Sequence, residues 1–243
     1  NNYIYFNCTD YSNQNAETCE LWRIIGVFDG KVKIMRSTPI ESLARDRTQS
    51  SISSPEYNAN WATSSITTLL NESYYKGDTA GTITYYSSSG MTITKTLDMN
   101  KIGIKNDTTR NMISEMTYSL LGWNTSSIYS DQIYNYERTT GSVYNTTRPT
   151  SWPGKIALAY PSDYGYAADF GKCQKQLSSY NDSACTSNNW MKAIIAPNYG
   201  WLLTPYSGGS TYAWYVYSSG SATGNNTYNT YGAAPVLYLG SEL

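Results

Sequence analysis

The sequence W-R-I-I-G-V-F-D-G-K-V-K-I-M-R, residues Trp22–Arg36, contains two strand-like runs on either side of a tight turn. β-branched and aromatic residues dominate Leu21–Phe28 and Val32–Met35, and Asp29-Gly30 lies between the two runs. Asp-Gly is favoured in two-residue hairpin loops because both turn residues there need a positive φ. The sequence therefore predicts an antiparallel β-hairpin close to its N-terminal end.

Further strand-like segments lie on both sides of this hairpin. Short runs rich in β-branched and aromatic residues predict strands at Tyr3–Phe6, Thr82–Tyr86, Lys155–Tyr160, Trp201–Thr204, Tyr212–Tyr217 and Ala234–Leu239. Side chains alternate between the two faces of a strand, so we expect Trp214 and Val216 to point inward and Tyr215 and Tyr217 to point outward. Because the first and last segments are both strands, we expect them to pair in one sheet.

Two helices are predicted between the strands. The first begins near Asn60 or Thr63 and places three apolar residues at helical spacing, namely Ile66, Leu69 and Leu70. The second spans Asp107–Leu121 and ends at Gly122, the residue type most common just after a helix. No internal repeat or linker divides the chain, so the sequence predicts one α+β domain over residues 1–243.

The composition limits the classes of partner. The formal net charge is −1 and no run of Lys or Arg occurs, so neither nucleic acid nor an anionic membrane is an expected partner. Only 14% of the residues are charged, whereas a cytosolic protein carries about a quarter. Ser, Thr, Asn, Gly and Tyr supply the polarity, as in many binding loops. No apolar stretch of about 18 residues is present, so we predict no membrane span.

Histidine is absent, which excludes Ser-His-Asp and Cys-His catalysis and any zinc site that needs imidazole. We therefore predict a protein that is not an enzyme and needs no cofactor or metal. Two acidic positions are candidates for other chemistry. Glu137-Arg138 is interpreted as a buried structural ion pair, and Asp163 as a turn cap in preference to a metal ligand.

The four cysteines form two local pairs, with ten and eleven residues between the partners. An even number at such spacings predicts two small-loop disulfides, Cys8–Cys19 and Cys173–Cys185, and an oxidising, extracellular compartment. The alternative is a metal site of four thiolates, which would require the two pairs to converge in space.

Six segments together resemble a known family. In order they are Trp22–Arg36, N-W-A-T-S-S-I-T-T-L-L-N-E-S-Y-Y (Asn60–Tyr75), W-P-G-K-I-A-L-A-Y-P-S-D-Y-G-Y-A (Trp152–Ala167), N-N-W (Asn188–Trp190), Y-G-W-L-L-T-P (Tyr199–Pro205) and G-A-A-P-V-L-Y-L (Gly232–Leu239). They look like an uncharacterised domain of bacterial surface proteins, related to the formylglycine-generating-enzyme branch of the C-type-lectin-like fold. The resemblance covers nearly the whole chain, and its motifs are structural, so they indicate fold better than function.

The resemblance implies a twisted antiparallel sheet with flanking helices and with the N- and C-terminal strands paired. It also implies export, behind a pilin-like anchoring helix upstream of Asn1 or at the end of a larger adhesin. The same fold carries the variable ligand-binding region of proteins diversified by retroelements, in which the variable positions lie near the C-terminus.

Three departures limit what carries over from the family. The chain lacks the Glu-Pro-Asn or Gln-Pro-Asp loop and the Trp-Asn-Asp strand that hold calcium in sugar-binding C-type lectins. No cysteine lies beyond Cys185, so the copper-binding cysteine pair of formylglycine-generating enzymes is missing. Ala234 stands where the related strand often has Arg, so an interior salt bridge is expected to be absent.

The segment from Tyr206 to Gly232 is composed almost entirely of Tyr, Ser, Gly, Thr and Asn. Large aromatic anchors among adaptable polar residues are typical of binding surfaces. The predicted ligand-binding residues are Tyr206, Tyr212, Tyr215, Tyr217, Asn225, Asn226, Tyr228, Asn229 and Tyr231. The alternative is an ordinary Ser/Thr/Tyr-rich hairpin, since the whole chain shares this bias.

Three functions compete. The first is adhesion, or binding of a protein or glycan ligand, at the cell surface through these C-terminal loops. The second is a structural role, as a subunit of a pilus-like or fibrous assembly that packs against copies of itself. The third is an enzyme that uses paired carboxylates, which the 18 acidic residues do not favour because none lies in a recognisable motif.

Overall fold

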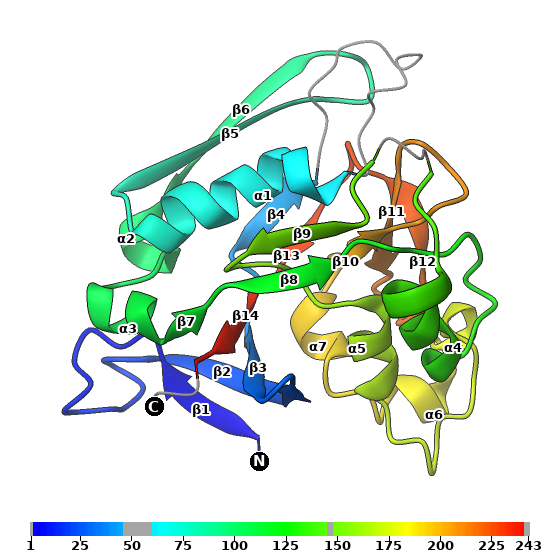
Figure 1. The fold of residues 1–243 in the computed structure, drawn as a ribbon, viewed down its shortest axis with the longest axis horizontal. Coiled ribbons are helices and arrows are strands. Elements are labelled where there is room, and N and C mark those ends of the chain that lie inside the picture. The colour runs from blue at the N-terminus through cyan, green and yellow to red at the C-terminus, as the bar shows by residue number, and fades with distance from the viewer. Residues whose placement is uncertain (1, 46–59, 145–147, 241–243) are drawn as a thin grey trace.

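The computed structural model describes residues 2–45, 60–144 and 148–240 (Figure 1). It is a mixed α+β structure in which most neighbouring strands are antiparallel. The strands are β1 (Tyr3–Phe6), β2 (Glu20–Phe28), β3 (Lys31–Arg36), β4 (Glu41–Ala44), β5 (Ala80–Tyr86), β6 (Thr92–Asp98), β7 (Ile113–Ser114), β8 (Met116–Ser119), β9 (Ser151–Gly154), β10 (Gly200–Pro205), β11 (Tyr212–Val216), β12 (Ala222–Asn226), β13 (Thr230–Ala233) and β14 (Val236–Leu239).

The helices are short and lie between the strands. They are α1 (Ser65–Leu69), α2 (Met99–Ile102), α3 (Asp107–Met112), α4 (Ser130–Asn135), α5 (Pro161–Tyr166), α6 (Ser183–Thr186) and α7 (Lys192–Ile195). Single π-helical turns extend α1 over Leu70–Tyr74 and α4 over Tyr136–Thr140. Short 3₁₀ turns lie at Trp61–Thr63 and Leu177–Ser179.

The predicted N-terminal hairpin is confirmed as β2 and β3. Its loop is Asp29-Gly30, with φ values of 51° and 74°, as a two-residue turn that follows the sheet twist requires. The hairpin belongs to a five-stranded sheet in the order β1-β2-β3-β14-β7. The last strand therefore pairs with β3 of the hairpin and, on its other side, with β7.

The direct pairing of the N- and C-terminal strands was predicted and is wrong. β1 and β14 share the first sheet, but β2 and β3 lie between them. Among the described strands, β1 pairs with β2 alone, because the long β2 strand offers β1 an antiparallel partner on the edge away from β3. It is therefore the β2–β3 hairpin, and not β1, that pairs with the last strand, β14.

The second sheet has the order β12-β11-β10-β13-β4, and only the β10–β13 pair is parallel. Each of its faces contributes to a hydrophobic core. Trp201, Leu203 and Tyr215 belong to one hydrophobic core, whereas Leu202 and Trp214 belong to another. Helices α4 to α7 contribute to the second core and α1 to the first, and Figure 1 shows these helices in two separate groups around the sheet. The outward orientation predicted for Tyr215 is therefore wrong, since its side chain is only 1% exposed.

The helix predicted over Asp107–Leu121 ends at Met112. The apolar residues that follow pair as strands, because β7 hydrogen-bonds to β14 and β8 to β9. Gly122 is consequently not a helix cap. It forms an isolated bridge with Ser142, and a Cβ there would lie 1.9 Å from the Pro205 carbonyl oxygen, so close backbone approach explains the glycine.

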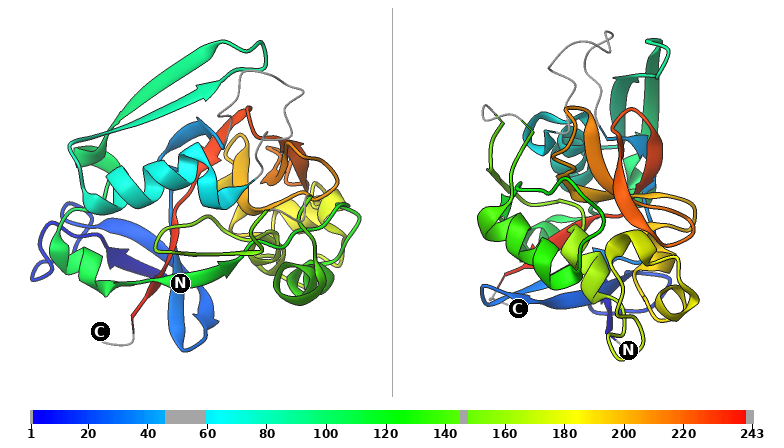
Figure 2. Two further views of the ribbon diagram at one scale, coloured as in Figure 1. Left: turned by 45° about the horizontal axis from the view of Figure 1, so that its top comes forward. Right: turned by 90° about the vertical axis from the view of Figure 1, so that its right-hand side faces the viewer.

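Of three other predicted elements, the helix and one strand are present, and the second strand is not. The helix after Asn60 is confirmed, with Ser64 as the N-cap of α1 and Asn60 capping the preceding 3₁₀ turn. The strand predicted at Thr82–Tyr86 lies in β5, which forms a long hairpin with β6 at the margin of the molecule (Figure 2). Its inner face packs in the first core through Ile83, Tyr85 and Leu97. Lys155–Tyr160 is largely buried but is not a strand, since it makes a single bridge, Ala157 to Val236.

Both predicted disulfides, Cys8–Cys19 and Cys173–Cys185, are present. They occupy different parts of the molecule and do not form a four-thiolate site. Within the described ranges, no group of three or more Cys, Asp or Glu side chains is placed to hold a metal ion. No described helix is both long and apolar enough to cross a membrane.

Candidate functional site

The nine predicted binding residues divide between the two faces of the second sheet. Opposite residues of neighbouring strands share a face, so the β11–β12 register places Asn225 with Ala213 and Asn226 with Tyr212. Strand alternation then puts Tyr215 on the Asn225 face and Trp214 on the Asn226 face. The nine residues therefore do not form one site.

On the Asn225 face, aromatic rings gather into a continuous cluster, the tyrosine face, made of Tyr199, Trp201, Tyr215, Tyr217 and Tyr231. The rings of Tyr215 and Tyr231 stack, with centroids 4.8 Å apart and planes at 16°. Tyr231 also lies 5.2 Å from Tyr199 and 4.6 Å from Trp201. Tyr217 contacts Tyr215 at 4.8 Å and Tyr199 at 5.8 Å. Trp201 and Tyr215 are buried and form the floor, whereas Tyr199 and Tyr217 are 40% and 39% exposed.

A short amide chain fixes one edge of this face. Asn225 donates from Nδ2 to the Tyr231 hydroxyl at 2.8 Å, and its Oδ1 accepts a hydrogen bond from Asn229 at 3.0 Å. Burial raises the pKa of Tyr231 to about 12, helped by the neighbouring tyrosines Tyr217, Tyr199 and Tyr228. The Tyr231 hydroxyl stays protonated at neutral pH and brings no charge to this face.

A pocket lined by hydroxyl groups adjoins Tyr217. Its volume is about 310 Å³ and its lining residues are Ser126, Ser178, Tyr217, Ser219, Ser221 and Thr223. Each of these side chains can both donate and accept a hydrogen bond. Tyr217 is thus shared between the aromatic cluster and an open, uncharged, hydroxyl-lined hollow.

Of the remaining predicted residues, Tyr206, Tyr212 and Asn226 lie apart from the tyrosine face. Tyr206 packs on Trp214 with ring centroids 5.1 Å apart, and it lies with the second core. Tyr212 is exposed, and Asn226 accepts a hydrogen bond from Thr211 at 2.7 Å. Tyr228 lies in the turn between β12 and β13.

The sequence interpretation missed Tyr199 and the serines of the hydroxyl pocket. Strand alternation could have found Tyr199, because it directly precedes β10 and lies two residues before Trp201, so an extended backbone places both on one face. The pocket had no comparable signal, since Ser126 and Ser178 come from loops far from β11 in sequence.

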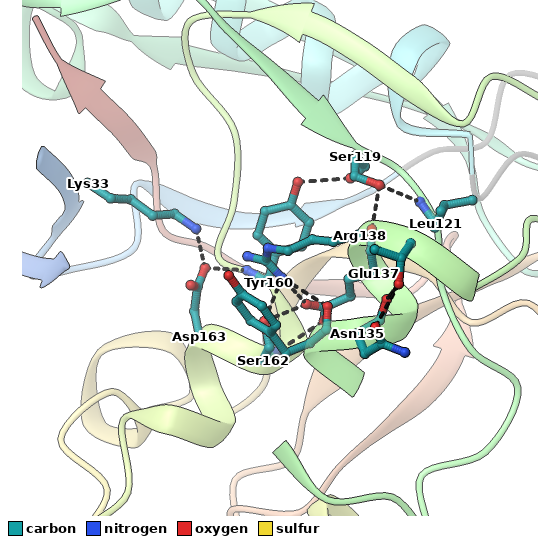
Figure 3. A network of polar contacts seen from close by, with 11 residues as sticks. Lys33, Ser119, Leu121, Asn135, Glu137, Arg138, Tyr160, Ser162 and Asp163 are labelled. Atoms are coloured by element: carbon teal, nitrogen blue, oxygen red, sulfur yellow. Dashed lines mark hydrogen bonds and ion pairs between the residues drawn. The ribbon is translucent and has the colours of Figure 1, made fainter. Parts of the chain in front are cut away.

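A second polar cluster lies beneath the β2–β3 hairpin and is drawn in Figure 3. Lys33 of β3 is fully buried and forms an ion pair with Asp163 of α5, within cation–π distance of the rings of Phe28, Tyr160 and Tyr238. Burial lowers the pKa of Lys33, and Asp163 opposes that shift. Asp163 also accepts the Tyr160 backbone N–H at 2.8 Å, which confirms its predicted role as a cap.

Glu137 and Arg138 form the buried ion pair that the sequence predicts, with 3.0 Å between Arg138 Nη1 and Glu137 Oε2 (Figure 3). Glu137 is fully buried and accepts hydrogen bonds from the backbone N–H of Ser162, at 2.9 Å, and from its hydroxyl. Burial raises the pKa of Glu137 to about 7, although Arg138 and Ser162 lower it and Asp163 raises it. The two ion pairs, from three segments, thus hold β3, α5 and the π turn after α4 together.

The raised pKa of Glu137 predicts a pH-dependent stability. Between its ordinary pKa of 4.5 and about 7, the folded state holds a proton that the unfolded state has lost, so this group's contribution to the free energy of unfolding falls as pH rises. Glu137→Gln removes that contribution. From about pH 4.5 to 7, we expect the free energy of unfolding of the variant, measured by chemical denaturation, to rise relative to that of the wild type. Above about pH 7 the difference between the two should stay constant. A difference that does not change with pH would contradict the raised pKa.

Comparisons with protein-family models, with curated proteins and with solved structures found no match to this chain. The resemblance to C-type-lectin-like surface domains therefore stays a prediction.

Proposed function

We propose that this chain is an extracellular ligand-binding domain and that the tyrosine face, together with the hydroxyl pocket, binds an uncharged glycan. The observation that carries the proposal is the position of Tyr217. Its ring is exposed beside Tyr199 and also borders a pocket whose other lining residues are all Ser or Thr. An exposed ring next to several hydroxyl groups matches a sugar, which presents C–H groups on one face and hydroxyls around its edge.

The rigidity of the face supports binding. Tyr217 and Tyr199 are held by ring contacts to buried Tyr215 and to Tyr231, so little side-chain freedom is lost when a ligand is bound. The absence of charge from this lining favours a neutral ligand over an acidic one. The two disulfides are consistent with an oxidising, extracellular compartment, where such ligands are displayed.

The test is a screen on an array of neutral and acidic glycans, followed by titration calorimetry with the strongest hit. Tyr217→Ala and Tyr199→Ala are each expected to weaken binding about tenfold or more, because a central aromatic anchor is lost. Tyr217→Phe keeps the ring and is expected to lose less than Tyr217→Ala.

The matched control is Tyr5→Ala, which removes a tyrosine of similar exposure, 41%, from β1 in the first sheet. It should leave glycan binding unchanged. No glycan bound at millimolar concentration, or equal loss in Tyr5→Ala and Tyr217→Ala, would refute the proposal. Ordered filaments of the purified chain would instead favour the structural-subunit hypothesis.

A further inference from the structure

A cleft of about 380 Å³ borders the first hydrophobic core through Tyr118, Tyr160 and Tyr238, and it shares no lining residue with the tyrosine face. Its walls are mainly aromatic and come from the β2–β3 hairpin, β8, α4 and β14. The aromatic lining residues are Phe28, Tyr118, Tyr134, Tyr160 and Tyr238. Asp29 and Arg138 supply the two charges of the lining.

Arg138 lines this cleft, and only part of its guanidinium group is used in hydrogen bonds. Its Nη1 atom is occupied, since it donates to Glu137 Oε2, to the Ser162 hydroxyl at 3.3 Å and to the Tyr134 carbonyl at 3.4 Å. Nε and Nη2 form no hydrogen bond within the described residues, and neither is a buried atom. The side chain is 23% exposed, and its guanidinium carbon lies 3.8 Å from the Tyr134 ring centroid. The Nε–Nη2 edge can bind a carboxylate through two parallel hydrogen bonds.

Asp29 supplies the opposite charge. It is exposed at the hairpin turn, and its carboxylate forms no ion pair or side-chain hydrogen bond within the part of the chain that the structure describes. Burial chiefly raises the pKa of Tyr238, while Arg138 lowers it and Asp29 raises it. Both charges therefore act on one hydroxyl in the cleft, yet they do not form an ion pair with each other.

We propose that this cleft binds a free α-amino acid or a close zwitterionic analogue. The carboxylate would lie on the Nε–Nη2 edge of Arg138 and the ammonium group against Asp29 and the neighbouring tyrosine rings, which favour a cation. The aromatic walls suit an apolar or aromatic side chain. A cleft of this size lies within the usual range for small-ligand sites, which is about 300–1,000 Å³.

The test is calorimetric titration of the full chain with a panel of L-amino acids at millimolar concentration. At least one apolar or aromatic amino acid is expected to bind, whereas its N-acetyl derivative and its methyl ester should each bind about tenfold more weakly or worse. The first derivative removes the ammonium charge and the second removes the carboxylate. Their separate losses would show that both charged groups are recognised.

Two conservative variants locate the site. Arg138→Lys keeps a positive charge beside Glu137 but lacks the two parallel N–H donors of the guanidinium edge. Asp29→Asn removes the negative charge and keeps a residue that tolerates the positive φ of the turn. Each is expected to weaken amino-acid binding about tenfold. Arg110→Lys changes an arginine of similar exposure, 21%, that pairs with Asp107, and Asp78→Asn changes an exposed aspartate; both are matched controls that should bind as the wild type does.

Tyr217→Ala should leave amino-acid binding intact, which keeps this site distinct from the glycan site. Thermal unfolding of each variant confirms that the chain is folded before binding is compared. No amino acid bound by the wild type, equal affinity for the methyl ester and the free amino acid, or unchanged affinity in both Arg138→Lys and Asp29→Asn would overturn the proposal.

Discussion

Asp163→Asn is expected to lower the free energy of unfolding by about 3–5 kcal/mol, as when one partner of a buried ion pair is removed. The variant leaves the fully buried Lys33 without its counter-charge, among the rings of Phe28, Tyr160 and Tyr238. Asn still accepts the Tyr160 backbone N–H, so the cap of α5 is kept and the change is mainly electrostatic. Urea denaturation at neutral pH measures the loss.

A double-mutant cycle separates the pair's mutual attraction from the cost of burying each charge. Lys33→Met alone should also destabilise, because Asp163 is then the buried charge without a partner. Lys33→Met combined with Asp163→Asn removes both charges and is expected to recover most of the lost stability. A loss below about 1 kcal/mol in Asp163→Asn, or no recovery in the double variant, would contradict a buried charged pair.

Removal of the Cys173–Cys185 disulfide by a double replacement with Ser is expected to cost about 3 kcal/mol or more. The bridge spans a sequence separation of 12 residues, a loop whose closure in the unfolded chain accounts for about 3 kcal/mol. Both sulfurs are also buried within the second hydrophobic core, so serine hydroxyls would lose packing and add polar groups there. Thermal and chemical unfolding of the variant measure the effect.

The Cys8–Cys19 bridge provides the matched comparison. Its sequence separation is 11 residues, so the loop contribution is nearly the same, but Cys19 is only partly buried. We expect its replacement by Ser to cost less than that of the Cys173–Cys185 pair. Equal losses would mean that loop closure alone sets the effect, and unchanged stability in either variant would contradict a stabilising bridge.

Local signals predicted the elements that depend on neighbouring residues. The Asp29-Gly30 turn specifies its hairpin because both residues adopt positive φ, whatever the rest of the chain does. Both disulfides were predicted because their partners are close in sequence. Elements that depend on distant partners were mispredicted. The apolar residues after Met112 have helical spacing, yet they are strands because β14 and β9 pair with them.

In the proposed binding surface, too, local sequence predicted one part and contacts between distant segments decided the rest. Composition indicated the Tyr206–Gly232 segment, but alternation alone could not show that both faces of β11 are covered and that Tyr215 is part of a core. Tyr199 and the serines of the hydroxyl pocket come from other segments. The cleft between Asp29 and Arg138 likewise joins residues more than a hundred positions apart.

The sequence by itself therefore determined the α+β class, the N-terminal hairpin, the two disulfides and the structural roles of Asp163 and the Glu137–Arg138 pair. Turn conformation, loop closure and the cost of an unpaired buried charge depend on a few residues and operate in any context. Only the tertiary structure decided which tyrosines are exposed, where β14 pairs and which side chains share a cleft. Those outcomes depend on contacts between distant segments, and local sequence patterns do not predict which segments will be in contact in the folded protein.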